Sequence, residues 1–571
     1  MIRNRLFLCT NDGRRHGIRI TKQHSVAFSS GSLCAMELIL FLLLAQAFAA
    51  LAIGTRMSGV AHVNGPKLGR IVSGLVGVQL LLAVLLSVWF AIDDRNPIEF
   101  ALSASAADFG LNKLVYYDGV SAFMLPLVSF IGWVVTRFSI RYLDGESQQA
   151  QYFRRLSFTI GAVSLISLSG NLAFFFLGWV CTSVGLHGLL MHYSDRPAAV
   201  ETAWTKFVTA RCGDALLLVA IVLIYQAFGT LDIALVLAGA KELANLGKVQ
   251  PIHASIAWLL FGCAMLKSVQ FPFHGWLPRS METPTPVSAL MHAGIVNAGG
   301  FLIVRFSPLA LASPSAMATT ATIGALTACF AGLAMMTQTS IKHSLAYSTI
   351  AQMGFMMMQC GLGAFSAAML HLVAHSIYKA YAFLNSGNIL DQAPSRSTAT
   401  ANPGSRWSAG SRWSAGSQVV TAGLAAGLSG ALVYAACWLL GMNLSEKPSG
   451  FLLAAIWCMA IAVMLWHSFA QSRTSSWKAG LFATPLLFLV YLSGFAAVNW
   501  MTATSIGTAT TGLSPIATWS LGALFIVVFL ASFTLVRQKN TALAAAIRVH
   551  ASNGFYVDDL VRRIAMPIAK S

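Results

Sequence analysis

Charged residues are scarce in this chain of 571 residues, since aspartate, glutamate, lysine and arginine together make up only 10% of it. Hydrophobic residues make up 56%, and the mean hydropathy is +0.69, well above the range of soluble proteins. Apolar runs repeatedly reach the roughly 20 residues that a helix needs to cross a bilayer. The composition therefore predicts an all-α polytopic membrane protein and excludes a soluble globular enzyme.

Several patterns that bind cofactors are missing. The nine cysteines occur singly, and no Cys-x-x-Cys pair is present, which argues against iron–sulfur clusters, structural zinc and a disulfide framework. The chain also lacks a strand–Gly-x-Gly-x-x-Gly–helix unit and a Walker loop, so it has no recognisable site for a dinucleotide or for ATP. We therefore expect neither a cofactor nor catalytic residues in this chain, and expect its energy to come from a gradient or from a partner.

Basic residues outnumber acidic ones, 37 to 19, giving a net charge of +18. They are scattered over helix ends and short loops instead of forming one basic face interleaved with aromatic residues, so nucleic acid is not an expected partner. Apolar runs bounded by turn and charge signals predict about fifteen membrane spans. These lie near 36–55, 70–92, 119–139, 154–168, 171–192, 203–226, 253–270, 286–306, 314–337, 341–361, 364–390, 418–441, 450–470, 478–500 and 513–536.

The loops that follow odd-numbered spans hold most of the arginine and lysine residues, for example Arg154, Arg196 and Arg279. The positive-inside rule puts these loops and the C-terminus in the cytoplasm and residue 36 outside. Residues 1–35 carry six basic residues against one acid and so should resist export. We expect them to be a basic disordered extension, and we hypothesise that translation starts naturally at Met36.

The predicted spans divide the chain into further segments. We expect N-terminal helices at 36–150, C-terminal helices at 471–542 and an amphipathic helix at 543–571. The family resemblance given below implies that the spans between them form a first repeat at 151–310 and a second at 311–470. Within the second repeat, residues 395–417 contain two copies of Gly-Ser-Arg-Trp-Ser-Ala, a low-complexity pattern that predicts a mobile cytoplasmic loop.

Lys267 lies near the end of an apolar run, in Lys-Ser-Val-Gln-Phe-Pro-Phe-His-Gly-Trp-Leu-Pro (267–278). Pro272 removes a backbone donor and clashes with the preceding turn, so we expect a helix break just after Lys267. Broken helices at membrane depth often build ion sites, and His274 and His292 lie close by in the sequence. We interpret Lys267 as a proton-path residue, the alternative being a structural kink with the lysine reaching to the interface.

His371, His375 and Lys379 recur every four residues, a spacing that places them along one helix face. Ionisable residues inside a membrane are costly and usually mark a proton or ion path. A His-x-x-x-His pair can also bind a metal, but no glutamate or obvious third ligand accompanies it here. We therefore expect a proton relay.

Two more residues are candidates for this path. Lys342 begins a span and is either a relay member or an anchor at the cytoplasmic end. Asp214, in Ala-Arg-Cys-Gly-Asp (210–214), is one of few acids at helix depth, and we expect it to neutralise Arg211 or a lysine across the bundle.

These motifs carry a family resemblance. The segment 267–278, Thr-Pro-Thr-Pro-Val-Ser-Ala-Leu-Met-His-Ala (283–293), Ile-Lys-His-Ser-Leu-Ala-Tyr-Ser (341–348) and His-Leu-Val-Ala-His-Ser-Ile-Tyr-Lys-Ala (371–380) resemble the proton-translocating antiporter module of respiratory complex I and of multisubunit cation/proton antiporters. The resemblance implies two inverted five-helix repeats, each with a broken helix. It makes Lys267 the central lysine of the first half-channel, and gives the link and the second half to His292, Lys342, His371, His375 and Lys379.

Two departures narrow the resemblance. Val180 follows Gly178-Trp179 where subunits of complex I have a glutamate, and the chain has no long lateral helix at its end. Together with the Asn-Gly-Phe-Tyr-Val-Asp-Asp-Leu tail (553–560), this resembles the membrane subunits of two-component inorganic-carbon accumulation complexes. That likeness implies a multi-pass protein of the bacterial inner membrane that passes protons, or another cation, to drive a DabA-like cytoplasmic zinc protein. The alternatives are a proton-pumping subunit of complex I and a cation/proton antiporter subunit.

Overall fold

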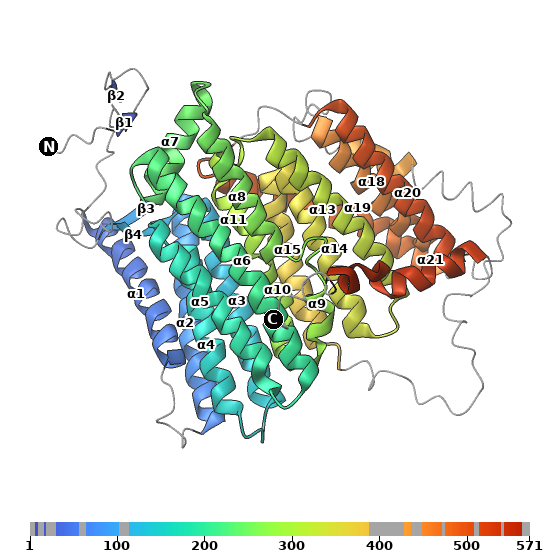
Figure 1. Cartoon of the computed structure of the whole chain (residues 1–571), viewed down its shortest axis with the longest axis horizontal. Coiled ribbons are helices and arrows are strands. Elements are labelled where there is room, and N and C mark those ends of the chain that lie inside the picture. The colour runs from blue at the N-terminus through green and yellow to red at the C-terminus, as the bar shows by residue number, and fades with distance from the viewer. Residues whose placement is uncertain are drawn as a thin grey trace. The chain divides into compact units, whose positions relative to one another are not determined.

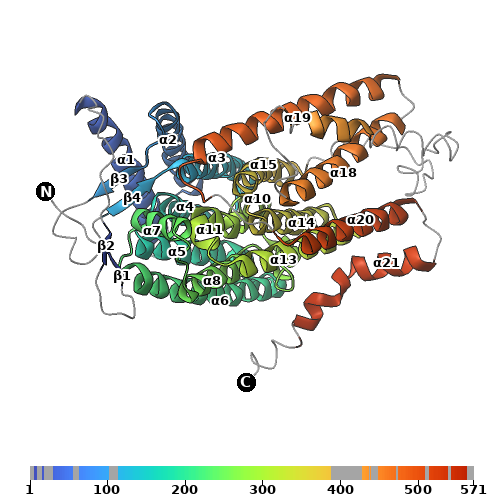
Figure 2. The same cartoon turned by 90° about the horizontal axis from the view of Figure 1, so that it is seen from above.

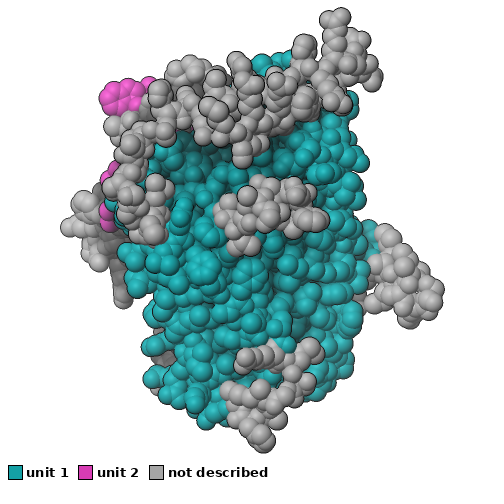
Figure 3. Space-filling view, turned by 90° about the vertical axis from the view of Figure 1, so that its left-hand side faces the viewer, with its two compact units in different colours: residues 1–384, 501–508, 550–571 teal, residues 385–500, 509–549 magenta. Residues whose placement is uncertain are grey.

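The structure of the protein is a computed structural model that describes residues 6–8, 16–18, 30–55, 64–101, 113–387, 427–435, 438, 448–470, 474–507, 513–537, 542–561 and 563. The described chain forms two compact units, coloured separately in Figure 3. The first comprises Met1–Leu384, Met501–Thr508 and His550–Ser571, and the second comprises Asn385–Trp500 and Ala509–Val549. The candidate site lies in the first unit.

The first unit is a helical bundle with two small hairpins (Figure 1). Its helices are α1 (Ser30–Thr55), α2 (Gly65–Ile92), α3 (Gly119–Tyr142), α4 (Gln149–Leu168), α5 (Leu172–Leu190), α6 (Pro197–Phe228), α7 (Ile233–Asn245), α8 (Pro251–Lys267), α9 (Trp276–Arg279), α10 (Thr285–Ala293), α11 (Ala298–Arg305), α12 (Ser307–Ala310), α13 (Pro314–Thr337), α14 (Ile341–Gly361) and α15 (Phe365–Leu384). Strands β1 (Leu6–Leu8) and β2 (His16–Ile18) pair antiparallel, as do β3 (Ile98–Ala101) and β4 (Lys113–Tyr117).

The second unit contains α18 (Pro448–Ala470), most of α19 (Thr474–Thr502), α20 (Pro515–Arg537) and most of α21 (Ala542–Ser552). Its small core joins Val433, Ile461 and Phe488, with Trp457 packed against it. The expected loop at 395–417 lies outside the described residues.

Sequence signals at the helix ends account for many of the boundaries. Prolines occupy the first turn of α6, α8, α10 and α13, where a missing backbone N–H costs nothing. Asp118, Asn171 and Asp232 cap α3, α5 and α7, each accepting a hydrogen bond from a backbone N–H. The helix bounds predicted at 314–337 and 341–361 are confirmed as α13 and α14. Of the two, α13 is also long and apolar enough to count among the candidate membrane spans.

Nine helices of the described chain are long and apolar enough to cross a membrane, compared with the fifteen or so spans that the sequence predicts. The span predicted at 286–306 is among the nine, as Thr285–Arg305, but its helix is interrupted: α10 ends at Ala293, and a short 3-10 turn (Ile295–Asn297) precedes α11. Gly294 lacks the side chain that would favour a continuous helix there. The predicted span 418–441 lies partly outside the described residues.

The structure describes only part of each terminal segment. The first 35 residues, expected to be disordered, lie mostly outside the described residues; those described include the β1–β2 pair and the start of α1 at Ser30, ahead of Met36. Leucine, phenylalanine and isoleucine in these strands favour extended backbone. Within the amphipathic helix expected over 543–571, α21 ends at Ser552, a 3-10 turn follows at Gly554–Tyr556, and helical backbone resumes at 557–561. The Asn553-Gly554 pair ends the helix because glycine readily takes the positive φ found there.

A buried ion pair ties α11 to the start of α3. Arg305 Nη1 lies 2.6 Å from Asp118 Oδ1, and both side chains are 1% exposed. Arg305 also donates to the Ser121 hydroxyl at 2.5 Å. Breaking such a pair leaves an uncompensated buried charge. This contact therefore fixes the C-terminal end of α11 in the bundle.

Helices α13 and α14 pack backbone to backbone, side by side in Figures 1 and 2. A Cβ added to Gly324 would lie 2.5 Å from the amide nitrogen of Met358, and one added to Gly354 would lie 2.5 Å from that of Ala328. Only glycine permits this approach. The two helices therefore form one closely joined pair.

Candidate functional site

The helix that carries Lys267 stops at that residue. α8 ends at Lys267, and the chain turns through Phe271 and Pro272 before α9 begins at Trp276. Lys267 is 7% exposed, and its ammonium group lies 4.4 Å from the centroid of the Trp179 ring and 3.4 Å from the Trp179 carbonyl oxygen. It therefore sits at the end of a half-helix, against α5.

Asp214 on α6 lies between two cations. Its Oδ2 is 2.7 Å from Arg211 Nη2, and its Oδ1 is 3.9 Å from Lys267 Nζ. The sequence left open whether Arg211 or a lysine across the bundle would be its partner. The structure brings both to the same carboxylate.

His274 is buried but does not join this cluster. Its ring stacks on Phe271, with centroids 6.1 Å apart, and meets Phe330 edge-on at 5.0 Å. Its Nδ1 has no hydrogen-bond partner among the described residues. His274 therefore lies in an aromatic pocket next to the helix break, apart from the charges around Lys267.

A second group of ionisable residues gathers on α15 and on the helices around it. The rings of His371 and His375 lie 6.0 Å apart, and the Nδ1 of His371 donates to Gln359 Oε1 at 3.1 Å. One turn further, Lys379 Nζ donates to the Ser348 hydroxyl at 2.7 Å. The four-residue spacing therefore places these three residues along one face of α15.

His292, at the end of α10, faces the same helix. Its ring stacks on Phe383 of α15 at 4.2 Å, and its Nδ1 forms a hydrogen bond with the Thr349 hydroxyl of α14 at 3.0 Å. Lys342 is different, since it lies half-buried in the first turn of α14. The structure thus brings His292 to the α15 residues and leaves Lys342 at a helix end, the position of an anchor.

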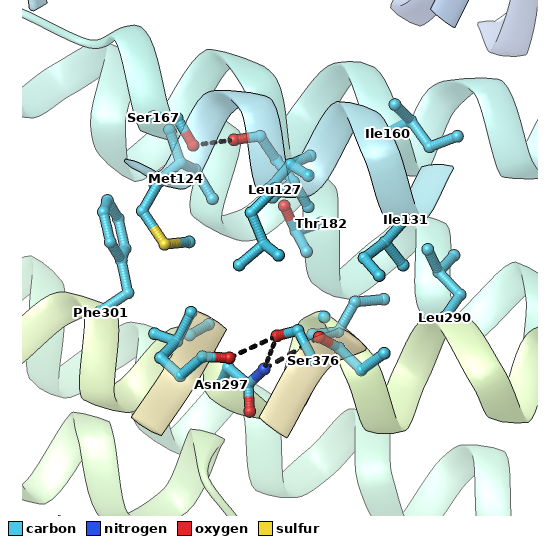
Figure 4. Close-up of a pocket in the computed structure, with 18 of the residues that line it drawn as sticks. Met124, Leu127, Ile131, Ile160, Ser167, Thr182, Leu290, Asn297, Phe301 and Ser376 are labelled. Carbon is cyan, nitrogen blue, oxygen red and sulfur yellow. Dashed lines mark hydrogen bonds between the residues drawn. The ribbon is translucent and has the colours of Figure 1, made fainter. Parts of the chain in front are cut away.

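A cavity of about 50 Å³ lies among α3, α4, α5, α10, α11 and α15 (Figure 4). Its wall is mostly apolar, but Thr182, Asn297 and Ser376 contribute polar groups. Thr182 belongs to the turn of α5 that follows Trp179, and Ser376 directly follows His375. The cavity therefore lies where the helices of the two groups approach each other, and a water there would have few polar partners.

The C-terminal segment docks on the helix break. Asp558 forms an ion pair with Arg279 of α9, and the ring of Phe555 lies 5.1 Å from that of Phe330, the residue that contacts His274. A Cβ on Gly275 would collide with the Asp558 carboxylate. The sequence suggested only a membrane-surface or partner-binding helix here, because nothing in its pattern identifies α9 and α13 as the docking site.

Sequence reasoning also missed Lys206 on α6, which is 4% exposed and donates to Ser183 of α5. Lys206 lies early in the predicted span 203–226, a position at which a lysine is usually an interfacial anchor, so the sequence does not mark it as a site residue. The one available signal was its position within an otherwise apolar helix.

Comparison with known proteins identifies the family and the fold of the chain. The sequence matches the family described as "NADH:quinone oxidoreductase/Mrp antiporter, TM" over residues 169–407, and "NADH-Ubiquinone oxidoreductase (complex I), chain 5 N-terminus" over residues 104–153. A chain of the Mrp complex from Dietzia sp. DQ12-45-1b has a similar fold, with a TM-score of 0.58 at 23% identity; the match covers 94% of this chain and 60% of that one. An archaeal membrane-bound sulfane sulfur reductase gives a TM-score of 0.54 at 18% identity, over 92% and 99%. The fold and the matches define the class: a multi-pass, antiporter-like membrane subunit.

Full-length relatives narrow the class. The probable inorganic carbon transporter subunit DabB2 of Halothiobacillus neapolitanus is 36% identical over 500 residues, 85% of this chain and 86% of that protein. DabB of Hydrogenovibrio crunogenus is 35% identical over 82% and 84%. By contrast, NADH-quinone oxidoreductase subunit L of Pseudomonas aeruginosa is 36% identical over only 56% and 53%. The chain belongs to the DabB family of inorganic carbon transporter subunits, and the resemblance read from its motifs is confirmed.

Proposed function

We propose that this chain is the cation-conducting membrane subunit of an energy-coupled complex that takes up inorganic carbon, and that protons move through it. The observation that carries the proposal is the alignment with DabB2 over 85% of the chain, at 36% identity. The buried ionisable residues around Lys267 and along α15 support the proton path, because charges at membrane depth persist where they serve transport.

In this proposal the path has two parts. Lys267 and Asp214, next to the helix break before Pro272, form the first, with His274 at its edge. His292, His371, His375 and Lys379 form the second, and Lys342 stands at its end. The chain would be built as two inverted five-helix repeats, as in the antiporter-like class. The break after α8 supports this for the first repeat, and much of the second repeat beyond residue 387 lies outside the described residues.

The orientation proposed is that of a bacterial inner-membrane protein with a cytoplasmic C-terminus. The charge distribution assigns both the loop around Arg279 and the C-terminal segment to the cytoplasm. The ion pair between Arg279 and Asp558 supports this, since the two residues must lie on the same side.

The hydration of carbon dioxide would be catalysed by a partner, a DabA-like cytoplasmic protein that carries the zinc of the complex. Protons running inward would make the partner's hydration one-way. One charge crossing 100 mV supplies about 2.3 kcal/mol, which corresponds to roughly fifty-fold accumulation per proton. A membrane gradient is therefore a sufficient source of energy.

The proposal is tested with the complex purified together with its partner and reconstituted into vesicles under an imposed membrane potential. Lys267→Ala and His375→Ala are expected to abolish proton uptake and carbon-dependent growth in air, while Lys248→Ala, at an exposed loop position, leaves both unchanged. Unimpaired growth of either path variant would refute the assigned path. Uptake that requires sodium would favour a cation/proton antiporter instead.

A further inference from the structure

Lys206 is a buried cation without an acidic partner. Its ammonium donates to the Ser183 carbonyl oxygen at 2.9 Å and lies 3.2 Å from the Ser183 hydroxyl. No carboxylate of the described chain lies within ion-pair distance of it. A buried ammonium held only by neutral oxygens is costly. A lysine that served only to stabilise the fold would be expected to have an acidic partner.

Lys206 and Lys267 share one helix as their support. α6 and α8 pack against each other and α5 packs against α6, so α5 receives both ammonium groups. Lys267 contacts the carbonyl oxygen of Trp179, and Lys206 contacts that of Ser183, one helical turn further along. Two lysines from different helices therefore reach the same face of α5.

Both lysines also line one small cavity. Leu266, Trp276, Val296 and other mainly apolar residues complete its wall, and its volume is about 10 Å³. That is roughly the space that one water requires, and Lys206, Lys267 and Thr209 are the lining residues with polar side chains that such a water could contact.

We propose that Lys206 is a second proton-carrying residue of the path, and that it exchanges protons with Lys267 through water in this cavity. The inference rests on the proposed function. Before the exchange, Lys267 passes its own proton along the path and becomes a neutral amine. In the exchange, the Lys206 ammonium then gives a proton to the water, and the water gives one of its protons to that amine. The total charge of the pair does not change, and Asp214 beside Lys267 stabilises the lysine that becomes charged.

The test compares three replacements of Lys206 in reconstituted vesicles that contain the complex with its partner. Lys206→Arg keeps the positive charge but cannot release a proton, because a guanidinium stays protonated. Lys206→Gln removes the charge, and Lys206→His restores a group that can exchange protons. The matched control is Lys248→Arg, at an exposed loop position. Co-purification with the partner and thermal unfolding report whether each variant assembles.

A proton carrier at this position requires that Lys206→Arg and Lys206→Gln each lower proton uptake at least tenfold. Lys206→His should keep a third or more of the uptake, and the control should be unaffected. Wild-type uptake by Lys206→Arg would overturn the inference and make Lys206 a fixed charge. If the arginine variant fails to assemble, the histidine variant decides, since uptake as low as that of Lys206→Gln would also overturn it. Lys267→Gln separates the two claims: if it conducts normally, the proposed function itself fails.

Discussion

The side-chain amide of Asn297 donates a hydrogen bond of 2.8 Å to the hydroxyl of Ser376. Asn297 ends the turn between α10 and α11, and Ser376 lies on α15 between His375 and Lys379. Figure 4 shows the two side chains meeting at the wall of the cavity of about 50 Å³ described above. This hydrogen bond thus holds the turn between α10 and α11 against α15, the helix that carries His371 and His375.

Removing this hydrogen bond should loosen α15. Asn297→Ala leaves a buried hydroxyl without its donor, and we expect a loss of about 1–3 kcal/mol in stability. Thermal unfolding of the purified complex measures it. Ser376→Ala and the double variant complete a cycle, in which a coupling energy near zero would contradict a direct interaction.

The Arg305–Asp118 pair should be far more important than ion pairs at the surface. Arg305→Met leaves Asp118 charged and buried, a loss of roughly 3–5 kcal/mol. The comparison is Arg196→Ala, whose partner Glu282 is 47% exposed, and for which we expect about 0–1 kcal/mol. Midpoints of thermal unfolding test both. Equal shifts for the two variants would show that burial does not decide the effect.

Gly275→Ala should displace the C-terminal segment, because its Cβ would occupy the position of the Asp558 carboxylate. We expect faster hydrogen exchange of the amides at 553–561, as docking contacts are lost. Gly332→Ala on α13 is the control, since a Cβ there meets nothing within 4 Å. Unchanged exchange in Gly275→Ala would mean that the segment does not dock on α9.

Lys113 provides a test at high pH outside the membrane-spanning helices. Burial lowers its pKa, but the hydrogen bond to Glu99 and the charges of Asp232 and Glu99 outweigh burial, so the pKa is raised. A raised lysine pKa stabilises the folded state below the unfolded value and loses that effect as the pH rises through the folded value. Lys113→Gln should therefore lower the unfolding temperature by a constant amount from pH 7 to about pH 10, the ordinary lysine range. Above that pH the difference should shrink, and a difference that grew instead would contradict this assignment.

Local signals in the sequence account for much of the bundle. Pro314 begins α13, and the polar stretch between Thr337 and Ile341 separates it from α14, so both helices could be predicted to the residue. The four-residue spacing likewise predicted that His371, His375 and Lys379 share a face. These features depend on residues that are neighbours along the chain.

Apart from the contact of Asp214 with a lysine across the bundle, features that depend on distant residues could not be predicted. The partner of Lys206 is a carbonyl oxygen 23 positions earlier, and backbone oxygens leave no trace in a sequence. The helix break at Gly294 is stabilised by the hydrogen bond from Asn297 to Ser376, a residue 79 positions further along the chain. The β3–β4 hairpin was missed because its strands are short and lie between long apolar runs.

The glycine contacts between α13 and α14 have a mechanical consequence. With backbones this close, the two helices cannot slide past each other, and we expect them to move together as one rigid pair. α14 carries Thr349, whose hydroxyl is hydrogen-bonded to the ring of His292. α13 carries Phe330, whose ring contacts that of Phe555 in the C-terminal segment. A displacement of the C-terminal segment would therefore be transmitted through the two helices to the buried imidazole of His292.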